Sequence, residues 1–161
     1  MRLILAGSAL SICFGTSAFT QDLRSCENTC LAGQTACQNA ATNTYNACLA
    51  NANVTYSTCA QSAQMDEQSC SVQAQEVGQS CIADPVPYCG NTCGSNCAPC
   101  CNQIANSWQA ACADAYNGDM AGCNSGLSND TSACQQAEAP ALAGCTQGYN
   151  GCMASCQNQY R

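Results

Sequence analysis

Cysteine recurs every 11 residues along both halves of the chain, and the positions between are mostly Ala, Asn, Gln, Ser and Thr. An α-helix turns about 100° per residue, so eleven residues make three turns with about 20° left over. A β-strand would place successive cysteines on opposite faces, because the spacing is odd. The pattern therefore predicts two long helices with cysteines along one face of each. These are Cys37, Cys48, Cys59, Cys70 and Cys81 in the first half, and Cys101, Cys112, Cys123, Cys134 and Cys145 in the second.

The two cysteine arrays are mirror images of each other in residue number. In an antiparallel helical hairpin, two residues at equal height have numbers that add to a constant, and here that constant is 182. We therefore predict an all-α fold: a long antiparallel two-helix hairpin held by a ladder of inter-helix disulfides. The predicted pairs, each a rung of the ladder, are Cys26–Cys156, Cys30–Cys152, Cys37–Cys145, Cys48–Cys134, Cys59–Cys123, Cys70–Cys112 and Cys81–Cys101.

Proline marks the expected ends of the two helices. The first helix is predicted over about residues 22–84, and Pro85-Val86-Pro87 ends it. A cysteine-rich tip follows over about residues 85–98. The second helix is predicted from Pro99, a favoured first helical residue, to about residue 159. Pro140 should kink this helix, because it lacks the N–H of an internal hydrogen bond.

Between the rungs, large residues are expected opposite small ones. The constant sum places Trp108 opposite Ala74 and Ile104 opposite Gly78, an alternation that lets two helices lie close together. After residue 20, however, Leu, Ile, Val, Met and Trp together number only 15. Two helices with so little apolar surface should not hold together without crosslinks. The disulfides are therefore predicted to supply most of the stability.

The first 20 residues have the pattern of an export signal. Arg2 gives the positive start, an apolar stretch runs from Leu3 to Gly15, and Thr16-Ser17-Ala18 offers small residues for cleavage. The apolar stretch is too short to span a bilayer, and no transmembrane segment is expected after it. Removal of the signal, with Cys13, leaves 18 cysteines, an even number that favours complete pairing. We therefore expect a secreted or periplasmic protein with a single hairpin domain over residues 21–161.

Charge and composition exclude several functions. The chain has three Arg and ten acidic residues, a formal charge of −7, and no His or Lys. Such a chain is unsuited to binding nucleic acid. The missing residue types exclude His-based catalytic triads, His-ligated metals, lysine Schiff bases and Walker-A loops. The acids are scattered, so we expect no enzyme activity and no cofactor.

The tip holds a second kind of cysteine cluster, formed by Cys89, Cys93, Cys97 and Cys100. Two structural disulfides would close the tip, although the spacing leaves their pairing open. A four-thiolate zinc or iron–sulfur site is an alternative. A third is thiol–disulfide exchange, because Cys97-Ala98-Pro99-Cys100 resembles the C-x-P-C motif of thioredoxin-like oxidoreductases and lies at a helix N-terminus.

Three families offer wider resemblances. The CxxxC pairs Cys26/Cys30 and Cys152/Cys156 resemble those of disulfide-stapled helical hairpins, the twin CxxxC or CX9C mitochondrial import proteins and the plant α-hairpinins. That resemblance concerns architecture and implies no partner. In composition and export the chain also resembles exported copper storage proteins, helical bundles lined with thiolates. Most cysteines here are about 16 Å apart along a helix, and only the CxxxC ends and the tip cluster are dense enough for multinuclear Cu(I).

The sequence thus favours an exported, non-enzymatic structural or interaction protein, a rigid rod acting as a spacer or surface component. Its protein or surface partner is not identified by the residues. Thiolate binding of Cu(I) or Zn and exchange at Cys97 and Cys100 are the alternatives. Asn53 and Asn129 begin glycosylation sequons, and the constant sum places them at one level of the rod.

Overall fold

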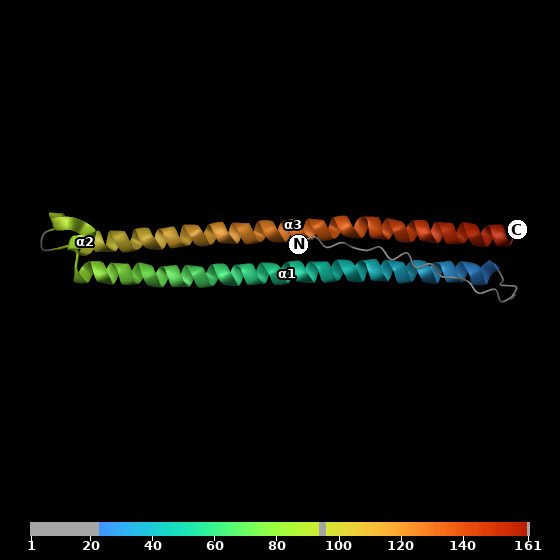
Figure 1. Cartoon of the computed structure of the whole chain (residues 1–161), viewed down its shortest axis with the longest axis horizontal. Coiled ribbons are helices and arrows are strands. Elements are labelled where there is room, and N and C mark those ends of the chain that lie inside the picture. The colour runs from blue at the N-terminus through green and yellow to red at the C-terminus, as the bar shows by residue number, and fades with distance from the viewer. Residues whose placement is uncertain (1–22, 94–95, 161) are drawn as a thin grey trace.

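A computed structural model describes residues 23–93 and 96–160 of the chain. The predicted signal peptide lies outside these described residues. Two long helices run side by side in opposite directions and are joined at one end by a short tip (Figure 1). They are α1 (Leu23–Ala83) and α3 (Ala98–Gln159). The predicted all-α hairpin is confirmed, and each helix is about 90 Å long at 1.5 Å per residue.

Seven disulfides join α1 to α3 and form the predicted ladder. Their Cα–Cα distances lie between 5.5 and 5.8 Å, within the usual range for disulfides. Such short spans bring the two helices close together along their whole length, so only small side chains fit between them. The pairs are Cys26–Cys156, Cys30–Cys152, Cys37–Cys145, Cys48–Cys134, Cys59–Cys123, Cys70–Cys112 and Cys81–Cys101.

The interior between the helices is built almost entirely from cysteine and alanine. In the central rungs the α3 cysteine is buried while its α1 partner lies nearer the edge; Cys123 is buried and Cys59 is exposed, for example. Alanines of α1, four residues after its cysteines, occupy the centre instead. The buried residues are Cys30, Ala52, Ala63, Ala74, Gly78 and Cys81 of α1, and Cys101, Cys112, Cys123, Cys134, Cys145 and Cys156 of α3.

The expected matching of large and small residues is only partly correct. Ala74 is completely buried, but Trp108 is 46% exposed, so the indole is not enclosed between the helices. Gly78 is a point of close approach, yet its neighbour is Ala105 rather than Ile104: a Cβ built on Gly78 would stand 3.0 Å from the Ala105 Cβ. Equal height does not determine how each helix is rotated about its own axis, and this rotation decides which side chains meet.

Helix α3 continues without interruption through Pro140. The expected sharp kink is not visible in the view of Figure 1, where α3 runs nearly straight beside α1. Rungs Cys48–Cys134 and Cys37–Cys145 flank the proline and tie that part of α3 to its partner helix. These crosslinks restrain the bend that a proline would otherwise introduce.

The tip is more regular than expected. It contains a short helix, α2 (Val86–Cys89), followed by a 3₁₀ turn, η1 (Gly90–Cys93). Pro87 is accommodated because the first turn of a helix needs no N–H from it. Gly90 ends α2 with φ +61°, a conformation that glycine adopts without strain.

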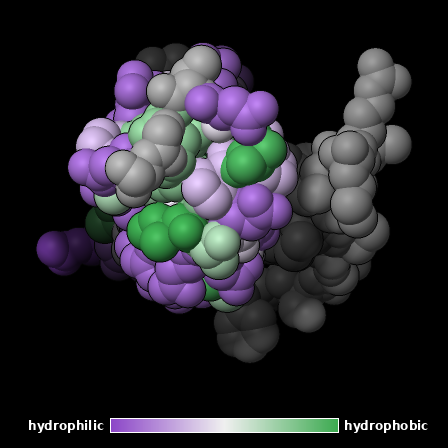
Figure 2. Space-filling view, turned by 90° about the vertical axis from the view of Figure 1, so that its left-hand side faces the viewer, coloured by the Kyte–Doolittle hydropathy of each residue, from purple (hydrophilic) through white to green (hydrophobic). Residues whose placement is uncertain are grey.

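Exposed hydrophobic side chains lie near the tip. Ile82 and Val86 are 59% and 57% exposed, and Tyr88 is 43% exposed. Figure 2 views this end of the molecule and shows separate hydrophobic groups with polar side chains between them. These side chains do not form one continuous patch. Other large hydrophobic side chains are exposed along the sides of the rod, namely Leu31, Val54, Met65, Val72 and Trp108.

The pairing of a central rung can be tested by comparing single and double substitutions. We expect Cys59→Ser alone to release one alkylatable thiol, on Cys123, because its partner is gone. Cys59→Ser combined with Cys123→Ser should release none. The stability loss should fall below the usual 2–5 kcal/mol for a lost disulfide, because flanking rungs hold the helices in register. Equal free-thiol counts in the two variants, by mass spectrometry after alkylation, would show that these residues are not paired.

Candidate functional site

The four tip cysteines form two separate disulfides. Cys89 pairs with Cys100, and Cys93 pairs with Cys97, with Cα–Cα distances of 6.3 and 4.9 Å. The sequence left this pairing open. The C-x-P-C resemblance suggested that Cys97 and Cys100 act together as one redox pair, and in the structure they are bonded to different partners. Cys97 is at the N-cap of α3 and reaches back to η1, whereas Cys100, one turn later, reaches α2.

The sulfur cluster at the tip differs from the predicted set. The Cys89 Sγ lies 3.7 Å from the Cys81 Sγ and 3.9 Å from the Cys101 Sγ. The last rung of the ladder therefore touches the Cys89–Cys100 disulfide. The sequence signal for this contact is that Cys100 and Cys101 are adjacent. Because they belong to different disulfides, those two disulfides must lie close together.

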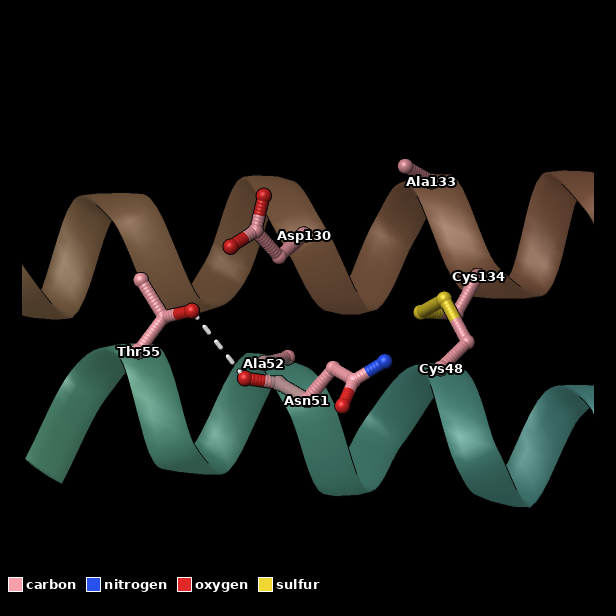
Figure 3. A pocket seen from close by; sticks show the side chains of 7 residues that line it. All are labelled: Cys48, Asn51, Ala52, Thr55, Asp130, Ala133 and Cys134. Carbon is pink, nitrogen blue, oxygen red and sulfur yellow. Dashed lines mark hydrogen bonds between the residues drawn. A yellow bond between two sulfur atoms is a disulfide. The ribbon is translucent and has the colours of Figure 1, made fainter. Parts of the chain in front are cut away.

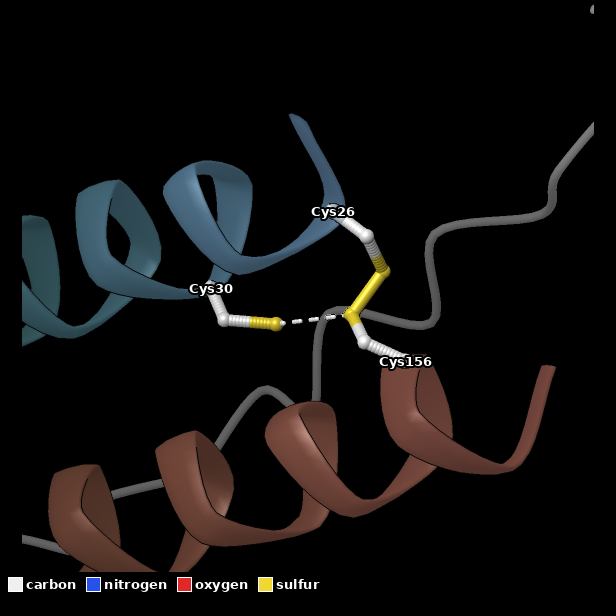
Figure 4. A group of neighbouring side chains, drawn as sticks. All are labelled: Cys26, Cys30 and Cys156. Atoms are coloured by element: carbon white, nitrogen blue, oxygen red, sulfur yellow. Dashed lines mark hydrogen bonds between the residues drawn. A yellow bond between two sulfur atoms is a disulfide. The ribbon is translucent and has the colours of Figure 1, made fainter. Parts of the chain in front are cut away.

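A second sulfur cluster lies at the open end of the hairpin, where the first two rungs meet. The Cys30 Sγ is 3.5 Å from the Cys156 Sγ, although the two residues belong to different disulfides (Figure 4). Neither sulfur carries a proton in this oxidised state, so the approach is a sulfur–sulfur contact. It arises because Cys26/Cys30 and Cys152/Cys156 each stand one helical turn apart on the same face of their helix.

The oxidation state determines what these clusters can do. All 18 cysteines from Cys26 to Cys156 are in disulfides, so these residues present no thiolate to a metal or a substrate. Metal binding and nucleophilic sulfur chemistry both require the thiolate. Either activity therefore begins with reduction of at least one disulfide.

Between the rungs, the edge of the seam forms shallow, open hollows. One of them, beside Cys48 and Cys134, is lined by Thr55 and Asp130 (Figure 3). The Thr55 hydroxyl donates to the Asn51 carbonyl oxygen at 3.1 Å, so it is engaged by its own helix. No polar or charged side chain among the described residues is buried. The hollows thus present water-exposed groups rather than the desolvated pairs that tune acid–base catalysts.

Comparison with known proteins gives no relative for this chain: no protein family, no curated protein and no solved structure matches it.

The disulfide content has a consequence for the compartment. So many disulfides in one chain are typical of proteins that mature in an oxidising environment outside the cytosol. Within residues 23–93 and 96–160, none of the helices has an apolar stretch that could cross a bilayer.

Burial should determine which rungs are reduced first. Cys37 and Cys59 are exposed, whereas Cys81 and Cys101 are both completely buried. Because exchange requires direct access of the reductant to a sulfur, we expect limiting phosphine to open Cys37–Cys145 and Cys59–Cys123 before Cys81–Cys101. Alkylation and peptide mapping after short reductions would give the order. In guanidinium chloride, where the chain is unfolded, all three disulfides should be reduced at similar rates. Early reduction of Cys81–Cys101 in the folded protein would contradict the prediction that burial sets the order.

Proposed function

We propose that this protein is an exported, non-enzymatic rod that acts as a rigid spacer or surface component. The observation that supports this is the ladder itself: helices of 61 and 62 residues are crosslinked at seven heights. The central rungs recur every 11 residues, or about 16 Å along the helices. Bending or separating the two helices would require distortion of several disulfides at once.

The surface of the rod agrees with a spacing role. Its sides carry short polar residues, and threonine hydroxyls at several positions donate to the carbonyl four residues earlier in their own helix. Asn53 and Asn129, the sequon residues, are both exposed. We propose the tip, where Ile82, Val86 and Tyr88 are exposed close together in the sequence, as the contact for a partner protein.

Storage of metal by the whole cysteine array has less support. The central rungs each supply two sulfurs and stand too far from the next rung to share a metal ion. A cluster of Cu(I) ions needs thiolates packed densely around it. The structure brings sulfurs of different disulfides together only near the two ends of the described ladder.

The repeat allows a direct test of the rod. Deleting residues 49–59 and 123–133 together removes one period from each helix and keeps every remaining cysteine opposite its partner. We expect small-angle scattering to show a rod of about 90 Å for the native chain and a loss of about 16 Å in the double deletion. Deletion of residues 49–59 alone is the matched control, because it shifts the register and should leave unpaired thiols.

The same two deletions separate the rod from other shapes. A native particle much shorter than the helices, or an unchanged length after the double deletion, would contradict the proposed spacer. Export can be checked separately by N-terminal sequencing of the protein from culture medium or periplasm. A mature chain that begins shortly after Ala18 is expected, and retention of the first 20 residues in the cytosol would oppose an extracytoplasmic role.

A further inference from the structure

The open end of the hairpin gathers four sulfurs from two helices. We call Cys26, Cys30, Cys152 and Cys156 the end cluster. The Sγ atoms of Cys26, Cys30 and Cys156 all lie within 4.8 Å of one another, and the Cys152 Sγ is bonded to that of Cys30. Two cysteines come from the first turns of α1 and two from the last turns of α3. All four sulfurs therefore occupy one small volume in the oxidised protein.

We propose that reduction of these two disulfides converts the end cluster into a four-thiolate site for a single Zn²⁺ ion. Zinc in such sites is tetrahedral with Zn–S distances near 2.3 Å, which places neighbouring sulfurs about 3.8 Å apart. The Cys30 and Cys156 sulfurs, from different helices and different disulfides, are already 3.5 Å apart. A small change in side-chain rotamers would then open room for the ion between four sulfurs.

The helices hold these thiols in place after reduction. Within each CxxxC pair the cysteines are one turn apart on a rigid helix, so their spacing does not depend on the disulfides. The next rung, Cys37–Cys145, lies seven residues further in, about 10 Å along α1. In molecules in which this rung or the next one, Cys48–Cys134, is still oxidised, it keeps the helix ends opposite each other after the end cluster is reduced. A central rung such as Cys48–Cys134 offers only two thiols on reduction, too few for this site.

Charge at this end acts in both directions. Glu27 and the negative C-terminal pole of α3 oppose an anionic centre, whereas two features beside Cys26 favour one. Zn²⁺ with four thiolates carries two negative charges. Arg24 is the one basic residue in the parts of the chain that the structure describes, and it stands two residues before Cys26. Cys26 also lies near the start of α1, where the helix dipole favours a thiolate over a thiol.

The chemistry balances with a dithiol as reductant. Each of the two disulfides takes two electrons and two protons from one dithiol, which becomes a cyclic disulfide. The four thiols formed then lose four protons as they bind Zn²⁺. The site is thus present only in the reduced state, and it does not depend on the spacer role proposed above.

Metal titration of two matched double variants tests the proposal. Cys30→Ser with Cys152→Ser removes half of the end cluster, and Cys48→Ser with Cys134→Ser removes one isolated rung. Each variant retains eight disulfides in the oxidised state, and its helical content is checked by circular dichroism. A limiting amount of phosphine is added anaerobically and removed by desalting, and alkylation with peptide mapping identifies the fraction in which the end cluster is reduced while inner rungs remain oxidised. Co²⁺ is titrated into this fraction as a probe of tetrahedral thiolate coordination, and Zn²⁺ is used to displace it.

We expect the native chain and the Cys48/Cys134 variant to bind with equal affinity at the end cluster, and Zn²⁺ to protect its four cysteines from alkylation. The Cys30/Cys152 variant should bind Co²⁺ more than about 100-fold more weakly. Mutating a residue that only hydrogen-bonds to a metal ligand typically costs about 10- to 100-fold, so a larger loss indicates that ligands themselves were removed. Equal binding by the two variants, absence of the tetrahedral Co²⁺ spectrum, or protection of Cys81, Cys89, Cys100 and Cys101 instead would overturn the proposal. If the Cys30/Cys152 variant does not fold, Cys26→Ser with Cys156→Ser provides the same comparison.

Discussion

Complete reduction of the disulfides will abolish most of the helical signal of this protein at 25 °C. The interior between α1 and α3 consists of cysteines, three alanines and one glycine, with no large aliphatic or aromatic side chain among its buried residues. Alanine burial contributes little, since hydrophobic stabilisation scales with the apolar area removed from water. Without the crosslinks, the two helices have almost nothing to hold them together.

The size of the effect follows from the number of rungs. One native disulfide typically contributes about 2–5 kcal/mol, and the stability of an ordinary domain is about 5–15 kcal/mol. The contributions of nested disulfides to the free energy of unfolding do not add independently. Even so, the loss of all of them should exceed the whole free energy of unfolding of an ordinary domain. Helix α3 also carries glycines at 118, 122, 126, 144, 148 and 151. Each costs about 1 kcal/mol relative to alanine, so α3 cannot persist as an isolated helix.

Far-UV circular dichroism with and without a phosphine measures this change directly. Alkylation of the reduced chain under native conditions should keep it unfolded, and reoxidation of unalkylated chain should restore the helical signal. A reduced protein that retained a cooperative, native-like helical transition would show that packing rather than crosslinking holds the fold.

Ala74→Leu should be the most damaging single substitution between the helices. Ala74 is completely buried, in a seam whose width is set by short disulfide spans at Cys70–Cys112 and Cys81–Cys101 on either side. A leucine there must push the helices apart or adopt a strained rotamer, which costs about 1–3 kcal/mol. We also expect incomplete formation of the two flanking rungs, because separated helices exceed the reach of a disulfide.

Guanidinium chloride unfolding and free-thiol counts measure both effects. Ala121→Leu is the matched control, since Ala121 is an exposed alanine of α3, and it should change stability by no more than about 0.5 kcal/mol. If Ala74→Leu unfolded at the same denaturant concentration as this control and carried no free thiol, the seam would be wider than the structure indicates.

The pairing of the tip cysteines could not be predicted from the sequence. Along the helices, a regular period converts residue number into height and angle. Between Ala83 and Ala98 the chain turns through α2 and η1, and no period relates one cysteine to the next. Resemblance of four residues to a redox motif suggested that Cys97 acts with Cys100, whereas the local turns bring Cys97 to Cys93. The contact of Cys89 with Cys81 and Cys101 likewise depends on the fold of the tip.

The sequence by itself determined the two helices, their antiparallel register and the seven rungs between them. The helices follow from the period of 11, which fits only a helix. The register and the rungs follow from the constant sum of 182, which fits only one hairpin register. The tertiary structure decided which cysteines of the rungs are buried, how the tip cysteines pair, and that the Cys30 and Cys156 sulfurs touch. These features depend on the rotation of each helix about its axis and on the path of the tip. Packing in three dimensions sets both, and residue spacing along the chain does not.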